Sequence, residues 1–217
     1  MKTELSRREF LESSALALGL STLSTLGSGC PNNTPSNLVY ITIDDGPGYY
    51  MEEMLDLFEQ TGDKATFFVL GQNCEDNYGY EMLIRALSEN HLIGNHSYSH
   101  PNFKEISPEE AQAQLLATHE IIQSAYDKLD IFNPKLFRYP FGAEAHQEVI
   151  SNKGYEVVRW NADTKDYEIG NTLTVDDVKE RCLGINPGDI VLTHDLEMTA
   201  REIIPFILES YSSSIVR

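Results

Sequence analysis

From residue 38 onward, short apolar runs alternate with amphipathic segments, and this alternation constrains the fold more than any other feature of the chain. Residues 38–43 are a run of β-formers, and residues 50–60 carry apolar side chains at helical spacing, namely Met51, Met54, Leu55 and Phe58. Further strands are expected at 65–70, 92–95, 134–138, 155–160 and 189–192. Further helices are expected at 80–90, 108–129, 145–153, 174–183 and 199 to about 210. Such a pattern predicts an α/β domain in which helices cover a parallel sheet, either open or closed into a barrel.

Polar side chains of chemical interest follow the predicted strands. In both versions of the fold, the ligand site lies at the carboxyl ends of the strands. A scattered set of structural polar residues would not collect at these positions, so we expect one site at that edge. The residues concerned are Asp44, Asp45, His96, His100, Arg138, Asp163, Asp166 and His194.

The segment His96-Ser-Tyr-Ser-His100 has the spacing of a metal site. Two histidines four residues apart can aim both imidazoles at one point if the segment turns helically, and a carboxylate from another strand end would complete the ligand set. Three protein ligands leave one position for water, whose pKa a bound metal lowers. The alternatives are two histidines without a metal, and a plain turn at residues 44–47.

Composition excludes some functions. The chain has 217 residues, 41% of them hydrophobic, which suits one domain with its own core. Its formal net charge of −18 argues against nucleic acid or another polyanion as the main ligand and leaves neutral substrates open. The acidity otherwise indicates a solvated surface.

Residues 1–30 have the features of an export signal. Arg7 and Arg8 precede an apolar stretch at 13–26, which at 14 residues is shorter than the ~20 that span a bilayer. The pattern resembles a twin-arginine signal, and its end resembles a lipoprotein box in which Cys30 is lipidated, although Gly27 stands where the box usually has leucine. Simple cleavage near Cys30 is the alternative. We expect an exported, periplasmic or cell-surface lipoprotein that contacts the membrane only through this lipid, with a polar tether at 31–37 and one domain at 38–217.

Two cysteines remain beyond Cys30. An exported setting would permit a disulfide between Cys74 and Cys182, but we favour two free, buried thiols. Their spacing along the chain does not decide between the two arrangements.

Five blocks of sequence, taken in order, carry a family resemblance. Residues 42–47, 96–100, 138–142, 163–167 and 192–195 resemble the five motifs of the polysaccharide deacetylases of carbohydrate esterase family 4, the NodB-homology domain. The resemblance spans about residues 38 to 210. It implies a distorted, incomplete (β/α) barrel of about six to seven parallel strands. It also implies metal-dependent removal of acetyl groups from an N-acetylated, or in some branches O-acetylated, glycan. We expect the protein to be a monomer.

The resemblance also implies the metal ligands and the general base. Asp45, His96 and His100 would hold one divalent ion, zinc first and cobalt as the alternative. Asp44 would act as the general base. Because successive side chains of a strand point in opposite directions, we expect Asp44 to stay off the metal while lying next to it.

A second set of residues would supply the general acid and adjust the pKa values of the acid and the base. By resemblance, His194 would protonate the leaving amine, a task that suits the ordinary pKa of histidine. Arg138 would pair with Asp44 and keep it ionised. Asp166 would raise the pKa of His194, with Asp163 as the alternative.

Four further residues would bind the substrate. The backbone N–H of Tyr139 would stabilise the oxyanion, whereas Pro140 has no N–H to donate, and Leu192 would line the acetyl pocket. Tyr167 stands where the fourth motif usually has tryptophan, which predicts an altered sugar groove. Trp160 is expected either in the core of a strand or as a substitute for that tryptophan.

Two regions depart from the family or have two interpretations. Tyr49 and Tyr50 either pack at a helix start, which we favour, or line the sugar groove. Residues 210–217 form a short tail where family members often carry a further strand, which puts closure of the barrel in doubt.

Two other functions stay open at this stage. The first is a catalytically quiet carbohydrate-binding lipoprotein on the same scaffold, although a binder has no need to retain Asp44, Arg138 and His194 together. The second is an amide hydrolase for a small non-sugar molecule. An acetate-release assay on residues 31–217 with a panel of acetylated glycans would separate them.

Overall fold

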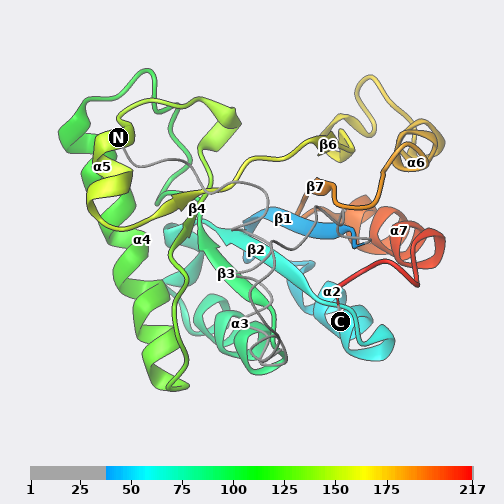
Figure 1. Ribbon diagram of the computed structural model, residues 1–217, viewed down its shortest axis with the longest axis horizontal. Helices are drawn as coiled ribbons and strands as arrows, with labels where there is room; N and C mark the ends of the chain where they lie inside the picture. The colour runs from blue at the N-terminus through cyan, green and yellow to red at the C-terminus, as the bar shows by residue number, and fades with distance from the viewer. Residues whose placement is uncertain (1–37, 217) are drawn as a thin grey trace, which may run out of the picture.

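Seven parallel strands form one curled sheet in the computed structural model, which describes residues 38–216 (Figure 1). The strand order is β5-β4-β3-β2-β1-β7-β6, and no pairing joins β5 to β6 among these strands. The sheet is therefore an incomplete (β/α) barrel, as predicted. The strands are β1 (Tyr40–Gly46), β2 (Ala65–Val69), β3 (Leu92–Asn95), β4 (Leu136–Phe137), β5 (Glu156–Val157), β6 (Ala162–Asp163) and β7 (Ile190–His194).

Helices cover the outside of the curled sheet (Figure 1). They are α2 (Met51–Thr61), α3 (Asn77–Ser88), α4 (Pro108–Lys128), α5 (Gln147–Asn152), α6 (Val175–Cys182) and α7 (Ile204–Ser210). The longest, α4, begins with the capping box of Ser107 and Glu110. Short turns η1 (Gly71–Cys74), η2 (Pro140–Gly142) and η3 (Asp166–Glu168) follow strands, and the π-helical η4 (Thr199–Ile203) precedes α7. Within residues 38–216, no helix is both long and apolar enough to span a membrane.

The predicted strand at 155–160 is wrong in its extent. Only Glu156 and Val157 pair with β4, which itself has just two residues before the chain turns at Pro140. The chain then crosses to the other sheet edge, where Ala162 and Asp163 pair with β7. Neither residue is a strong β-former, so this strand depends on its partner and has no sequence signal of its own.

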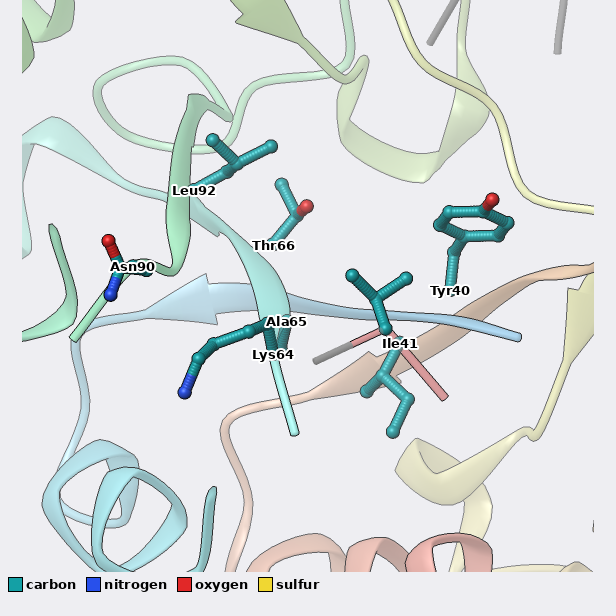
Figure 2. Close-up of a pocket in the computed structure, with 8 residues that line it drawn as sticks. Tyr40, Ile41, Lys64, Ala65, Thr66, Asn90 and Leu92 are labelled. Atoms are coloured by element: carbon teal, nitrogen blue, oxygen red, sulfur yellow. The ribbon is translucent and has the colours of Figure 1, made fainter. Parts of the chain in front are cut away.

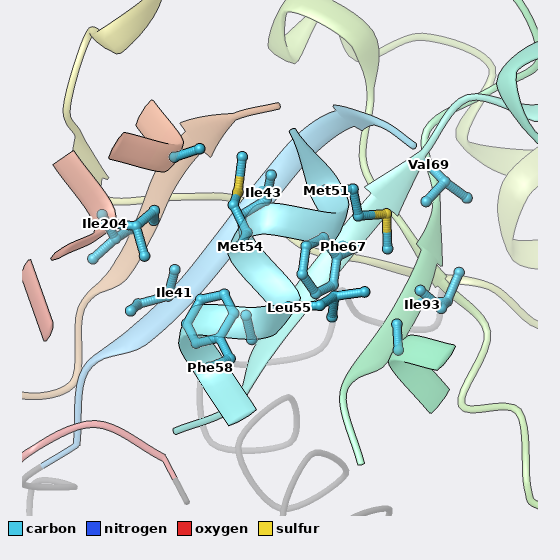
Figure 3. Packing of buried hydrophobic residues seen from close by; sticks show 14 of the residues in the cluster. Ile41, Ile43, Met51, Met54, Leu55, Phe58, Phe67, Val69, Ile93 and Ile204 are labelled. Carbon is cyan, nitrogen blue, oxygen red and sulfur yellow. The ribbon is translucent and has the colours of Figure 1, made fainter. Parts of the chain in front are cut away.

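Side chains of β1 alternate between two environments. Ile41 and Ile43 point outward into the main apolar cluster, where they meet Met54 and Phe58 of α2 (Figure 3). Tyr40 belongs to a separate, inner cluster with residues in or directly after the other strands: Phe68, Leu92, Leu136, Val158 and Ile190. The inside of the half-barrel is thus a packed core and not a channel.

The amino ends of the strands are closed. A pocket among the first residues of β1, β2 and β3 holds only about 20 Å³, room for roughly one water (Figure 2). The C-terminal segment covers this end, because Ile215 bridges Val39 in parallel and the Val216 carbonyl accepts a hydrogen bond from Lys64 N at 2.7 Å. This pocket is therefore too small to hold a sugar ring.

Cys74 and Cys182 are both free and buried, so the disulfide alternative is wrong. Burial raises the pKa of each thiol, for Cys182 to about 12, and both are protonated at neutral pH. The expectations for the export signal, Cys30 and the tether concern residues outside those the structure describes.

Candidate active site

A cavity of about 400 Å³ lies at the carboxyl ends of the strands. Eight of the predicted site residues line it: Asp44, Asp45, His96, His100, Tyr139, Tyr167, Leu192 and His194. Two more, Arg138 and Asp166, lie behind the wall, each 2% exposed or less, and contact residues that line it. Pro140 is buried in η2 and does not line the cavity.

Asp45, His96 and His100 converge on one point. Their ligand atoms all lie within 4.8 Å of one another, and Asp45 Oδ1 is 3.5 Å from His96 Nε2 and 3.4 Å from His100 Nε2. This oxygen is buried and accepts no hydrogen bond. His96 Nδ1 donates to the Arg138 carbonyl at 2.8 Å, which leaves the Nε2 lone pair facing the group. One carboxylate and two imidazoles so arranged suit a divalent ion such as zinc.

Burial also keeps His96 in the form that binds metal. It lowers the pKa of this imidazole to about 3, although the charge of Asp45 opposes the shift. The ring is therefore neutral at physiological pH.

The segment 96–100 does not turn helically, contrary to the premise of the sequence argument. Ser97 and His100 instead have positive φ angles of 72° and 62°, and Ser97 Oγ accepts a hydrogen bond from His100 N at 3.1 Å. These two left-handed residues fold the loop so that the imidazole centroids lie 5.0 Å apart. The convergence was predicted correctly, but its backbone basis was not.

The expectation that Asp44 and Asp45 point in opposite directions is also wrong. Both line the cavity, and Asp44 Oδ2 is only 3.6 Å from His96 Nε2. Asp45 has a φ of 72°, and the register with β2 shifts between Asp44 and Gly46. This bulge turns the second carboxylate back toward the first, so strand alternation does not separate them.

Arg138 binds one of the two carboxylate oxygens of Asp44. Its Nη1 donates to Asp44 Oδ1 at 2.8 Å and to Thr42 Oγ1 at 2.7 Å, and its guanidinium lies 4.2 Å from the centre of the Phe68 ring. Burial raises the pKa of Asp44, while the charges of Arg138 and His194 oppose the increase. Because Arg138 binds Asp44 Oδ1, the other oxygen, Oδ2, is left facing the cavity.

His194 is paired with Asp166 and not with Asp163. His194 Nδ1 donates to Asp166 Oδ1 at 2.8 Å, and Asp166 Oδ2 accepts from His194 N and from Thr199 Oγ1, each at 2.6 Å. Burial lowers the pKa of His194, but the hydrogen bond and charge of Asp166 outweigh it and raise the pKa to about 9. Asp163 lies in the cavity wall. The structure thus separates two aspartates that the sequence left as alternatives.

The acid and base candidates lie side by side because of strand register. Asp44 is the register partner of His194 in the parallel pairing of β1 with β7. Their side chains therefore project from the same face of the sheet. Leu192, one pleat below His194, also lines the cavity.

Aromatic rings border the cavity. Tyr167 packs edge-on against His194 with centroids 5.1 Å apart. Phe141 and Trp160 also line the cavity. Phe141 was not predicted as a groove residue, whereas for Trp160 this was one of two alternatives. The Phe141 side chain is 69% exposed, has a φ of 58° and contacts His100 edge-on at 4.4 Å. The position of Phe141 inside the third motif could have predicted that it lines the cavity.

The interpretation of Trp160 as strand core is wrong. It follows β5 and precedes β6, and its ring packs over Gly142, where an added Cβ would lie 3.0 Å from the indole. Tyr50 packs partly buried against the main cluster at the start of α2, as favoured. Tyr49 is 94% exposed and lies outside the cavity.

Asp195 is a further residue that sequence reasoning missed. Its carboxylate accepts hydrogen bonds from Gly48 N at 2.6 Å and Tyr50 N at 3.3 Å, and so fixes the loop that follows Asp45. Burial raises the pKa of this carboxyl against those two bonds. It was visible as the last residue of the fifth motif.

Comparison with known proteins agrees with this geometry. Residues 31–158 match the family model for polysaccharide deacetylase, and the chain belongs to that family. It is 33% identical over 160 residues to a peptidoglycan-N-acetylglucosamine deacetylase of Bacillus cereus, covering 72% of this chain and 55% of that protein. The fourth and fifth motifs lie beyond the part matched by the family model.

Solved structures show the likeness over most of the chain. Chitin deacetylase of Colletotrichum lindemuthianum superposes with a TM-score of 0.74 at 30% identity, covering 85% of each chain. Peptidoglycan deacetylase PdaC of Bacillus subtilis gives 0.72 at 30% identity, covering 82% of this chain and 86% of that one. The chain spans between about a third and just over half of the peptidoglycan deacetylases it matches in sequence, 34% and 55% in two cases.

Proposed function

We propose that this domain is a metal-dependent hydrolase that removes acetyl groups from the N-acetylated sugars of a polysaccharide. The observation that carries the proposal is one cavity containing the Asp45, His96 and His100 group together with a buried base candidate and a histidine of raised pKa. A divalent ion in that group would polarise the acetyl carbonyl and activate water.

Asp44 suits the role of general base. Arg138 binds one of its oxygens, and the other faces the cavity. Burial raises the pKa of the carboxyl, which makes its ionised form a stronger proton acceptor. We therefore assign to Asp44 the removal of a proton from the attacking water.

His194 suits the role of general acid. With a pKa of about 9, its imidazole is protonated near neutrality, and Asp166 occupies Nδ1, so Nε2 is the nitrogen left to donate to the leaving amine. The backbone N–H of Tyr139 donates to no described residue and is assigned to the oxyanion. Leu192 would contact the acetyl methyl.

The substrate is proposed to be an acetylated glycan. The relatives are named for peptidoglycan and for chitin, two polymers of N-acetylated sugars. Phe141, Trp160 and Tyr167 surround the cavity with ring surfaces on which a sugar ring can stack. No observation favours a quiet binder or a hydrolase of small non-sugar amides.

An acetate-release assay tests the proposal. Purified protein loaded with zinc or cobalt should release acetate from peptidoglycan, chitin oligomers or another acetylated glycan, lose this activity on chelation, and regain it on metal return. Full activity in metal-free protein would rule out the metal. Binding of glycans without any acetate release, in every metal form, would favour the quiet binder instead.

For location, we propose that Cys30 carries a lipid that anchors the domain outside the cytoplasm, with residues 31–37 as a tether. A lipoprotein cysteine carries several acyl chains, each buried CH₂ contributing roughly 0.8 kcal/mol. Cys30→Ser should move the protein from the membrane fraction to the soluble exported fraction at unchanged specific activity. Soluble wild-type protein with an unmodified Cys30 by mass spectrometry would refute the anchor.

A further inference from the structure

The turn η1 (Gly71–Cys74), which follows β2, contacts both loops that supply the candidate metal ligands. Toward β1, the Asn73 side-chain amide donates to the Asp45 carbonyl at 3.0 Å, and Leu70 N just before the turn donates to the Gly46 carbonyl at 2.8 Å. Toward the other loop, Gly71 N and Gln72 N donate to the carbonyls of residues 97 and 98, each at 3.1 Å. The turn η1 thus connects the loop that carries Asp45 with the loop that carries His96 and His100.

This junction is needed because β2 lies between the strands that carry the ligands. Asp45 is on β1, and the two histidines follow β3, while the strand order is β3-β2-β1. The sheet ladder does not hold Asp45 in place, since the register with β2 passes from Asp44 to Gly46 and skips it. Its φ of 72° is strained for a residue with a Cβ.

The loop of the two histidines has more support than Asp45. Beyond its contacts with η1, Gln114 of α4 accepts hydrogen bonds from Tyr98 N at 2.9 Å and Ser99 N at 2.8 Å. The Asp45 carbonyl receives one side-chain hydrogen bond, from Asn73. A backbone carbonyl at a bulge needs such a partner to keep its conformation.

The turn itself is rigidly packed. An added Cβ on Gly71 would lie 2.4 Å from Thr118 Oγ1 of α4, and one on Gly79 of α3 would lie 1.9 Å from the Asn73 carbonyl. Two helices therefore press on η1, so the position of the Asn73 amide is set by the core.

We propose that Asn73 is a positioning residue for the metal site. Its amide holds the left-handed Asp45 peptide, and so directs the Asp45 carboxylate to the point where His96 Nε2 and His100 Nε2 converge. It does not touch the ion. The inference rests on the proposed metal site, and it predicts that metal affinity depends on a residue outside the five sequence motifs.

Two variants and one control test it. Asn73→Ala removes the donor, and Asn73→Asp keeps the shape but places an oxygen against the Asp45 carbonyl, so its effect should be the larger. Asn77→Ala is the control, because Asn77 is exposed at the start of α3 and its side chain makes no hydrogen bond to the described residues. Zinc affinity by competition with a chromophoric chelator, the visible spectrum of the cobalt-loaded protein and thermal unfolding of the metal-free protein are measured together.

Both Asn73 variants should weaken zinc binding by about 10- to 100-fold and change the cobalt spectrum, as losses around metal ligands do. The melting temperature of the metal-free protein should stay within a few degrees, and Asn77→Ala should match wild type throughout. Wild-type affinity and spectrum in both Asn73 variants would overturn the inference. The inference would also be overturned if the Asn73 variants lost stability while their zinc affinity and cobalt spectrum stayed as in wild type. Wild-type protein that binds neither ion would instead overturn the proposed metal site.

Discussion

Two buried histidines lie at opposite ends of β3, His91 before its first residue and His96 after its last. Both are 2% exposed, and burial lowers the pKa of each imidazole to about 3. By residue type, burial and charge they are alike. They differ in which ring nitrogen carries the hydrogen, and this follows from what each ring faces.

His91 Nδ1 accepts a hydrogen bond from Ala65 N at 3.0 Å, so its Nε2 carries the hydrogen, and its ring packs against Phe58 and Phe67. His96 is the other tautomer, with Nδ1 donating to a carbonyl and the Nε2 lone pair directed at Asp45. The first ring is part of the core, near a pocket of about 20 Å³, and the second lines a cavity of about 400 Å³. A buried histidine is thus assigned to structure or to a site by its partners, not by its burial.

Between substitutions of His91 and His96, at the two ends of β3, the largest expected difference is in metal binding. His96→Ala should lose the ion and at least ~10³-fold in rate of acetate release, because a metal contributes several kcal/mol to stabilising the transition state. Metal content by elemental analysis and turnover are the measurements. An active, metal-loaded His96→Ala protein would contradict the assignment of His96 as a metal ligand.

At the carboxyl end of the sheet, substitutions of the general base and of a metal ligand should have different effects on metal content. Asp44→Asn should retain one metal per chain and lose about 10²- to 10⁴-fold in rate, the usual cost of removing a general base. Asp45→Asn should instead weaken metal binding. Wild-type turnover in the Asp44 variant at neutral pH would show that the base lies elsewhere.

The pH profile should sharpen the assignment of the acid. Activity should fall as pH rises through the pKa of His194, since the deprotonated ring cannot donate. Asp166→Asn removes the partner that raises this pKa, so the basic limb should move to lower pH. At pH 7.5 the loss should be about tenfold, because an imidazole of ordinary pKa near 6.5 is then about one-tenth protonated. Asp163→Asn serves as the control and should leave the limb in place.

The smallest effect on activity is expected at the amino end. His91→Ala should keep the metal and the rate, and lose about 2–4 kcal/mol of unfolding free energy, because it opens a cavity and leaves Ala65 N unpaired. The folded pKa of His91 lies below its ordinary 6.5, so its contribution is fully present above about 6.5 and is lost as pH falls toward 3. Denaturant unfolding across this range should show that the variant loses less stability on acidification than wild type.

The prediction of the site succeeded where it depended on strand ends and failed where it depended on backbone detail. The carboxyl ends of parallel strands meet at one edge, which is why the order of strands and motifs along the chain was enough to place residues from five separate blocks together. The bulge at Asp45 and the left-handed Ser97 have no local signal, because positive φ at a residue with a Cβ is imposed by surrounding contacts. The strand-core interpretation of Trp160 was wrong for a related reason, since the strand expected there stops after Val157.

By itself, the sequence determined the α/β class, the family and most of the side chains that line the candidate site, because periodicity and ordered motifs are local properties of the chain. Only the tertiary structure decided which aspartate partners His194 and why two adjacent carboxylates share one cavity. Those outcomes depend on contacts between segments far apart in sequence, and on burial that shifts pKa values by removing water. Neither a spacing nor a composition contains that information.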